Sequence, residues 1–257
     1  MILAHSDKLP ENRSKRSRYY IMIPKITHPL FDVTIPSTKK KTKVRPMLGR
    51  EEKILLIAKQ GRDKNEILSA VKNVVTNCIH DANLNLDTLT TFDIEYLFVK
   101  LRAVSINNVT KVTFLDNEDE KEYEFEIDLN NVEIKYPENV EKIIKISDTI
   151  GIELVYPAAS LFEDTSFTSG DEIESFDKLI CKCISKIFEG EKVYQSQFIE
   201  QGELIEFLDN LDIPNLNKIR AFVTNLPCLD HQIKYTNSVG TERQIVLKTL
   251  EDFFILY

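Results

Sequence analysis

A thiol, a carboxylate and an imidazole lie within four residues of this 257-residue chain, in Cys228, Asp230 and His231. These are the group types of a nucleophile with its base. Catalytic groups usually converge from distant segments, however, and these three follow Pro227 in one short stretch. We therefore interpret Cys228 as half-buried and His231 as a surface residue, and we predict no catalytic residue.

Two other cysteine-containing segments carry ligand types for metal ions. Cys181 and Cys183 lie two positions apart in a segment of helical period, so they project about 200° from one another and share an ion with difficulty. Cys78, His80 and Asp81 form a single cluster with no partner pair elsewhere. We predict a core position for Cys183, a semi-exposed one for Cys181 and a core-facing helix end at Cys78, with no metal and no cofactor.

A row of acidic side chains could supply paired glycosidase carboxylates or a cation site. Its members alternate with apolar residues: Glu122, Glu124, Glu126 and Asp128. Acid catalysis needs burial and a raised pKa, whereas a regular row is more simply the solvated face of a strand. We interpret its acidity as serving solubility or docking. The chain contains no glycine-rich phosphate loop, His-Glu-x-x-His helix or Gly-x-Ser-x-Gly elbow.

Positive charge is concentrated at the start of the chain. Residues 1–50 hold 12 Lys and Arg against three acids, which leaves the other 207 residues at −17. Clustered Lys and Arg on a mobile element can bind the phosphates of a nucleic acid. They can equally bind an acidic protein partner, such as the acidic hairpin of a second copy. Nucleic acid is the weaker alternative, because −17 repels it and aromatic interleaving is limited to Tyr19 and Tyr20.

Composition and targeting signals indicate a soluble protein made in a cytoplasm. The chain is 42% hydrophobic and 29% charged, and it has no run of 18 apolar residues and no signal peptide. Its four cysteines lack the spacing of a secreted disulfide scaffold, so reduced thiols are expected. Only seven glycines disfavour folds with glycine-rich phosphate turns.

Hydrophobic periodicity predicts an α+β fold in which helices alternate with antiparallel hairpins. Three regions follow: a basic arm with short strands over 1–47, helices and then hairpins over 48–156, and helices, a hairpin and an apolar C-terminal segment over 157–257. Strands are expected at 19–24 and 31–36, with residues 37–43 as a basic hairpin tip. Thr90 and Asp93 form a capping box, and a helix from Ile173 is expected to continue through Ile187 to Gly190.

The chain also repeats its landmarks once, at a spacing of about 105 to 118 residues. Cys78-Ile79 is matched by Cys183-Ile184, the segment 94–101 by 204–211, and the hairpin at 109–129 by that at 231–247. One interpretation is two related helix-plus-hairpin halves behind the basic N-terminal β region. The other is the ordinary alternation of any α+β chain.

The segment Phe31–Ser37, followed by 44–58, resembles the opening of the baseplate hub protein family of T-even-like contractile-tailed phages. Cys78-Ile79, the helix at 93–102 with its following hairpin, and the ending from Gly240 are similar in kind and order, so the resemblance covers roughly residues 30–257. It implies a non-enzymatic protein that is made late in infection, in the host cytoplasm, and that is found in the baseplate of the virion tail. The protein would act as a permanent subunit of the hub or as a factor in its assembly.

The resemblance also implies partners and one absence. Other baseplate hub and tail proteins are the expected partners, with a homo-oligomer as a further option and no membrane. Some relatives place paired cysteines in their hairpin turns, where this chain has residues 116–120 and 236–240, so no structural zinc is carried over and cross-strand packing must hold the hairpins. The expected partner-binding residues are Arg16, Arg18, Lys39, Lys40, Lys41, Lys43, Arg45, Phe253, Phe254 and Tyr257.

Overall fold

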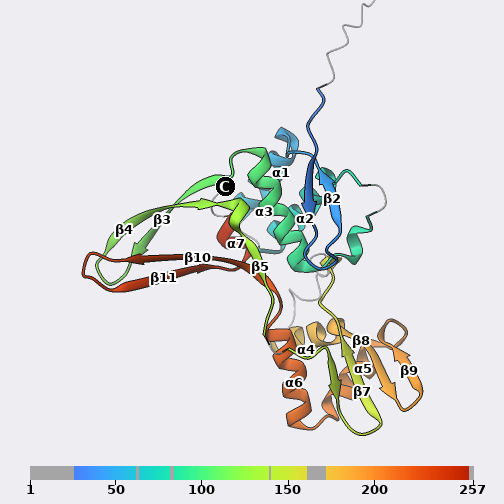
Figure 1. Ribbon diagram of the computed structural model, residues 1–257. Coiled ribbons are helices and arrows are strands. Elements are labelled where there is room, and N and C mark those ends of the chain that lie inside the picture. The colour runs from blue at the N-terminus through green and yellow to red at the C-terminus, as the bar shows by residue number, and fades with distance from the viewer. Residues whose placement is uncertain (1–25, 62–63, 82–83, 139, 161–171, 255–257) are drawn as a thin grey trace, which may run out of the picture.

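The computed structural model describes residues 26–61, 64–81, 84–138, 140–160 and 172–254 (Figure 1). The helices are α1 Gly49–Gly61, α2 Lys64–Cys78, α3 Thr91–Ser105, α4 Glu172–Cys183, α5 Gln201–Asp209, α6 Ile213–Thr224 and α7 Leu250–Phe254. The strands are β1 Phe31–Thr34, β2 Lys41–Val44, β3 Val109–Asp116, β4 Lys121–Asp128, β5 Glu133–Lys135, β6 Ile143–Lys145, β7 Ile150–Leu154, β8 Ile184–Glu189, β9 Lys192–Gln195, β10 Cys228–Thr236 and β11 Glu242–Leu247. The predicted α+β class is confirmed.

Elements from the two ends of the chain build the first lobe, which we define as residues 26–135 and 228–254. The hairpin of β1 and β2 packs with α1, α2 and α3 around one apolar core. Helix α3 begins as predicted: the Thr90 hydroxyl accepts from the Asp93 amide, and the Asp93 carboxylate accepts from the Thr90 amide. Ile94, Leu97, Phe98 and Leu101, which recur at helical spacing in the sequence, are fully buried, so local signals determined how this helix starts and which face it buries.

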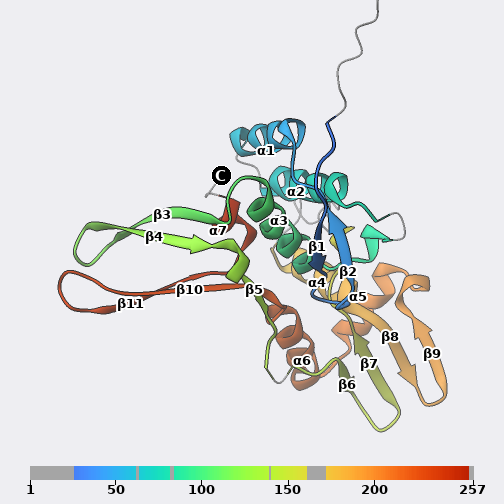
Figure 2. The ribbon, with the colours of Figure 1, turned by 45° about the horizontal axis from the view of Figure 1, so that its top comes forward.

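The second lobe, residues 140–226, is formed by a sheet of order β6-β7-β8-β9 with α4, α5 and α6 (Figure 2). The chain enters this lobe after β5 and leaves it before β10. Strand β5 pairs antiparallel with residues 228–230 of β10, so the outgoing and returning segments hydrogen-bond to each other. Between the lobes, the Tyr156 ring lies 5.4 Å from that of Phe92 in α3 and 5.5 Å from that of Phe222 in α6.

The predicted helix from 173 through 187 is wrong in its second part. Helix α4 ends at Cys183, and Ile184 begins β8. The register against β7 shifts so that Leu154 opposes Ile184 while Glu153 opposes Lys186. This bulge inserts Ser185 and turns both Ile184 and Ile187 toward the core, a spacing of three that imitates a helix. Gly190 has a φ of +59° and serves the β8–β9 turn rather than capping a helix.

The packing also bears on the predicted regions and the duplication. Strands β7 and β8 pair across residue 157, so a division there does not coincide with the sheet. The Arg45 amide donates to the Cys78 carbonyl (2.9 Å) and the Val155 amide to the Cys183 carbonyl (2.8 Å), so both cysteines end helices in equivalent pairings. The hairpins are not equivalent, because β3 follows α3 directly whereas α6 intervenes before β10. The duplication stays a prediction.

Candidate functional site

The cysteine and histidine candidates lie in structural positions. Residues three apart in a strand point to opposite faces, so Cys228 and His231 of β10 are not a nucleophile and base. Burial raises the pKa of the Cys228 thiol and lowers that of His231. Both residues are half-buried, so the surface placement predicted for His231 is wrong.

Burial likewise governs the other thiols. It raises the pKa to about 11 at Cys78 and Cys181 and to about 12 at Cys183, all of which are buried. Cys181 is only 6% exposed, so the semi-exposed placement predicted for it is wrong. Across the described ranges, no group of three or more His, Cys, Asp or Glu residues is arranged to hold a metal ion.

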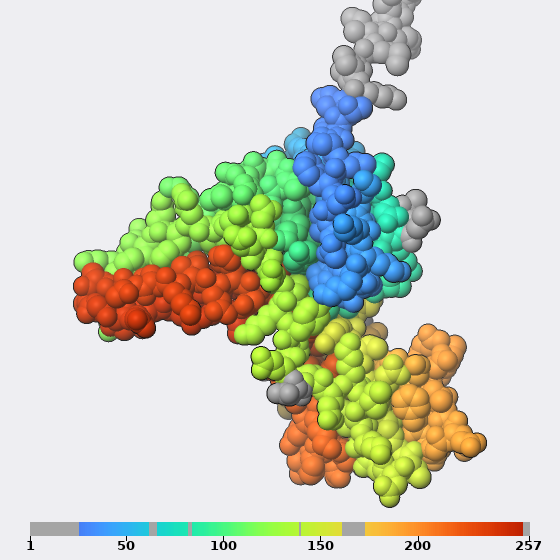
Figure 3. Space-filling model, viewed as in Figure 1, coloured from blue at the N-terminus to red at the C-terminus, as the bar shows by residue number. Residues whose placement is uncertain are grey.

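A protruding arm is the most distinctive feature of the first lobe. The hairpins β3–β4 and β10–β11 lie against each other and extend together away from α3 (Figures 1 and 3). Their facing sides carry aromatic rings: the Tyr235 ring lies 4.9 Å from that of Tyr123 and 5.1 Å from that of Phe125. At the base of the arm the core continues into Val99, Leu229 and other buried residues of α3 and β10.

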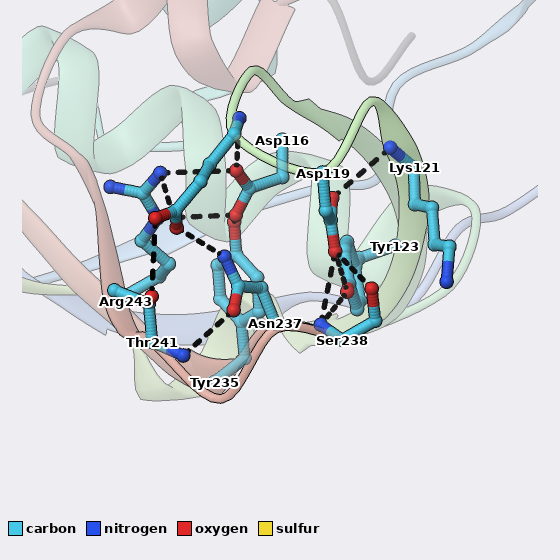
Figure 4. A network of polar contacts seen from close by, with 10 residues as sticks. Asp116, Asp119, Lys121, Tyr123, Tyr235, Asn237, Ser238, Thr241 and Arg243 are labelled. Carbon is cyan, nitrogen blue, oxygen red and sulfur yellow. Dashed lines mark hydrogen bonds and ion pairs between the residues drawn. The ribbon is translucent and has the colours of Figure 1, made fainter.

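The two turns at the end of the arm are joined by polar contacts, which we call the tip network (Figure 4). Asp116, buried at 4% exposure, accepts from the Tyr235 hydroxyl (2.8 Å) and from Arg243 Nε and Nη2 (both 3.2 Å). Glu118 accepts from the Asn237 side-chain amide at 2.6 Å and pairs with Arg243 at 3.2 Å. The amide of Glu118 and then these side chains lower the pKa of Asp116.

Asp119 forms the other half of the tip network. Its carboxylate accepts from the Tyr123 hydroxyl at 2.6 Å, and from the amide (3.0 Å) and hydroxyl (2.8 Å) of Ser238. These bonds, led by that of Tyr123, lower the pKa of Asp119 well below its usual range. Residues 116–119 thereby hold residues about 120 positions later in the chain, and the two hairpins form one rigid element.

The tip network was missed by the sequence-based reasoning, which expected only cross-strand packing and the core beneath to hold the turns. The available signal was the pairing of the two hairpins in the predicted repeat: their turns at 116–120 and 236–240 lie 120 positions apart, slightly beyond the predicted spacing of about 105 to 118 residues. Polar residues alone do not reveal it, because turns carry Asp and Asn for local reasons.

The outer face of the arm carries the acidic row. Glu122, Glu124 and Glu126 are exposed on β4, and Lys111 of β3 contacts Glu124 at 2.7 Å and Glu126 at 4.0 Å. A solvated row was predicted for Glu122, Glu124, Glu126 and Asp128, and the structure confirms it for the three glutamates. Asp128 instead is half-buried and binds the amides of Asn108 and Asn130.

The basic hairpin, which we define as residues 31–45, is the second exposed feature. The predicted hairpin is confirmed, but its tip is shorter than the predicted 37–43, because residues 41–43 belong to β2 and pair with β1. The tip is fixed to α3: Ser37 donates through its amide and its hydroxyl to Asp93, and the Tyr136 hydroxyl donates to the Pro36 carbonyl at 2.8 Å. Lys39 has a φ of +58° and lies 5.0 Å from the Tyr136 ring. The exposed lysines are Lys39, Lys40, Lys41 and Lys43.

Other residues predicted to bind partners have internal roles. Arg45 donates to the buried Glu51 carboxylate at 2.8 Å and to the Asn77 carbonyl at 2.9 Å. Phe253 is fully buried, and its carbonyl accepts from Arg102 at 2.7 Å. Phe254 is in α7, but its side chain, like Arg16, Arg18 and Tyr257 and the strand predicted at 19–24, lies outside the described residues.

The chain is an α+β protein with two exposed surfaces that its own contacts hold in place, the arm and the basic hairpin. Surfaces of this kind suit contacts with other macromolecules. Comparison with protein families identifies the kind of assembly: the family model described as T4 bacteriophage base plate protein matches residues 28–255, and the chain belongs to this family. It is a structural protein of the phage baseplate. Searches of curated proteins and of solved structures found no match. None of the helices described here has the length and apolar character to span a membrane.

Proposed function

We propose that the protein acts in the baseplate hub, as a permanent subunit or as an assembly factor, through protein–protein contacts and without catalysis. Family membership supports a baseplate role. The observation that carries the finer proposal is the arm: the tip network joins two hairpins far apart in sequence into one projecting element (Figure 4). A pre-organised surface loses less conformational entropy when it binds a partner.

The basic hairpin is the second proposed contact. Its four exposed lysines lie on the tip and on β2, and Asp93 and Tyr136 hold the tip in place. We propose that Lys39, Lys40, Lys41 and Lys43 meet an acidic partner surface, together with Arg16 and Arg18 of the preceding segment. Arg45 and Phe253 are not proposed as contacts, because Arg45 pairs with the buried Glu51 and Phe253 belongs to the core at the base of the arm. Phe254 and Tyr257 remain proposed contacts near the C-terminus.

Capture of the tagged protein from phage-infected cells tests the proposal. We expect baseplate hub proteins to co-purify with the wild type and to be depleted when Lys39, Lys40 and Lys41 are changed to Glu. Reversal of exposed charge elsewhere, as in Lys145→Glu with Lys248→Glu, should leave the set of captured proteins unchanged. Recovery of no baseplate protein would overturn the hub proposal.

Mass spectrometry of purified virions separates the two hub roles. A permanent subunit is recovered in stoichiometric amount, whereas an assembly factor is absent from the particle although it is captured from infected cells. The nucleic acid alternative is tested with the same lysine variant. It requires binding to DNA or RNA that weakens steeply with salt and is lost in the variant. Absence of binding at low salt removes it.

A further inference from the structure

The acidic row lies on a sheet face that nothing in the described part of the chain covers. Strands β3 and β4 turn their aromatic side toward β10 and β11, which leaves Glu122, Glu124 and Glu126 pointing outward. Leu115 pairs with Glu122 on this face and is 60% exposed. The hairpin of residues 109–128 contains eight acids and two lysines. It therefore presents a strongly negative face with an apolar side chain within it.

The basic hairpin presents the complementary face. In β2, Lys41 and Lys43 point outward while Thr42 and Val44 are buried. Residues 31–45 contain five basic residues and one acid, Asp32, which contacts Lys43 at 3.4 Å. Outward residues in a strand repeat about every 6.8 Å, so Lys41 and Lys43 have the same spacing as neighbouring members of the acidic row. The two faces thus match in charge and in repeat.

These two faces cannot meet within one molecule. The arm extends from one side of α3, and the basic hairpin lies on the other side (Figures 1 and 2). Both are held in place: buried residues such as Val99 and Leu229 pack the base of the arm on α3, and Asp93 and Tyr136 hold the basic hairpin. A flexible swing of one toward the other is therefore not available, whereas a second molecule can present the matching face without rearrangement.

We propose that the acidic outer face of β3 and β4 in one copy docks on the basic hairpin of a second copy. This inference rests on the proposed role in assembly, and it names the partner of the exposed lysines. The contact joins two different surfaces, so one copy of a pair keeps its basic hairpin unused and the other copy keeps its acidic face unused. Such heterologous contacts produce a closed ring when the rotation between copies closes, and an open chain when it does not.

Charge-reversal variants of the full chain test the docking, with sedimentation velocity as the measurement of assembly state. We expect the wild type to self-associate at low ionic strength and to dissociate as salt is added, because exposed charges are screened. The basic-face variant is Lys41→Glu with Lys43→Glu. The acidic-face variant is Glu122→Lys with Glu126→Lys, which leaves the Lys111–Glu124 pair intact. Each should self-associate at least about tenfold more weakly, because like charges then face each other.

An equimolar mixture of the two variants provides the decisive measurement. The basic-face variant keeps an acidic arm and the acidic-face variant keeps a basic hairpin, while the reversed surfaces also complement each other. Alternating copies should therefore restore association, which a general loss of folding or solubility does not predict. Circular dichroism of each variant checks the fold.

Matched controls reverse the same number of charges away from both faces. Lys145→Glu with Lys248→Glu, and Glu203→Lys with Glu206→Lys, change exposed residues and should associate as the wild type does. A wild type that stays monomeric at low salt overturns the proposal, as does a mixture that fails to associate or a control pair that loses association. Capture of hub proteins from infected cells is a separate readout, so failure of self-association leaves the proposed function testable on its own.

Discussion

Replacing Glu51 by glutamine asks how much the fold depends on the ion pair that Arg45 forms. The Glu51 carboxylate is fully shielded from water and accepts from Arg45 Nη2 (2.8 Å), Arg50 Nε (2.7 Å) and the Leu48 amide (2.9 Å). Burial alone would raise the pKa of Glu51, but these hydrogen bonds outweigh it and lower the pKa from 4.5 to about 2. The charged form is therefore strongly favoured in the folded protein.

The magnitude follows from linkage between protonation and folding. A fall of the pKa from 4.5 to about 2 corresponds to about 3.4 kcal/mol of stability at neutral pH. Water screens part of this, since the Arg50 side chain is 70% exposed. We expect Glu51→Gln to lower the free energy of unfolding by about 2–3 kcal/mol at pH 7, below the roughly 3–5 kcal/mol for breaking a fully buried pair.

The pH dependence has a defined sign. Because the folded-state pKa lies below the unfolded one, the stabilisation is complete above about pH 4.5 and is lost as the pH falls toward 2. Urea unfolding followed by circular dichroism at pH 7 and pH 3 measures it. The difference between wild type and variant should shrink by more than half at pH 3. Glu52→Gln, at the exposed neighbouring position, is the control. An equal difference at both pH values would falsify this account of Glu51.

Three further perturbations test the burial of single groups and the arm. Burial raises the pKa of Glu95 to about 7, and no described residue pairs with it. Glu95→Gln should therefore raise the free energy of unfolding by about 1–3 kcal/mol above pH 7 and leave it unchanged near pH 4.5. Thermal melts at pH 4.5 and pH 8 that show the same gain would contradict this. Phe253→Ala should lower the free energy of unfolding by about 3–5 kcal/mol in urea, because its ring is fully buried, and a near-neutral result would return Phe253 to the list of surface contacts. Asp119→Ala with Tyr123→Phe removes both acceptors of the Ser238 amide and should speed its exchange, while Leu229 at the base of the arm stays protected. The exposed Asp148→Ala should change neither, and an unaltered Ser238 in the double variant would show that the tip network is not what holds the turn.

Several elements could be predicted from local sequence because their determinants are local. The capping box joins residues three apart, Thr90 and Asp93, and the helical stripe that follows needs only the period of α3. Alternation along β4 likewise fixed which side of the strand carries the acidic row. These predictions needed no knowledge of what packs on the other side.

The error at α4 has a tertiary cause. Ile184 and Ile187 both face the core of the second lobe because β7 opposes β8 with one residue bulged. A bulge changes the period of a strand from two to three at one point, and the sequence of β8 by itself cannot distinguish that from a helical turn. Only the pairing partner, contributed by residues 150–154, resolves the choice.

The roles of charged residues divide in the same way. Arg45 and the exposed lysines belong to one basic run in the sequence, yet Arg45 folds inward to Glu51 while Lys40 and Lys41 remain exposed. Strand alternation predicts that neighbouring side chains point to opposite faces, but it does not predict that Arg45 will pair with a buried carboxylate of α1.

The sequence by itself determined the α+β class, the starts of helices, the basic hairpin and the acidic face, because each depends on residues within one turn or one strand. The tertiary structure decided that β10 and β11 return to the first lobe, that residues 116–119 bind residues 237–243, and that the acidic and basic faces lie on opposite sides of α3. These arrangements join positions more than a hundred residues apart, and polar turn residues carry no local mark of the partner they will meet.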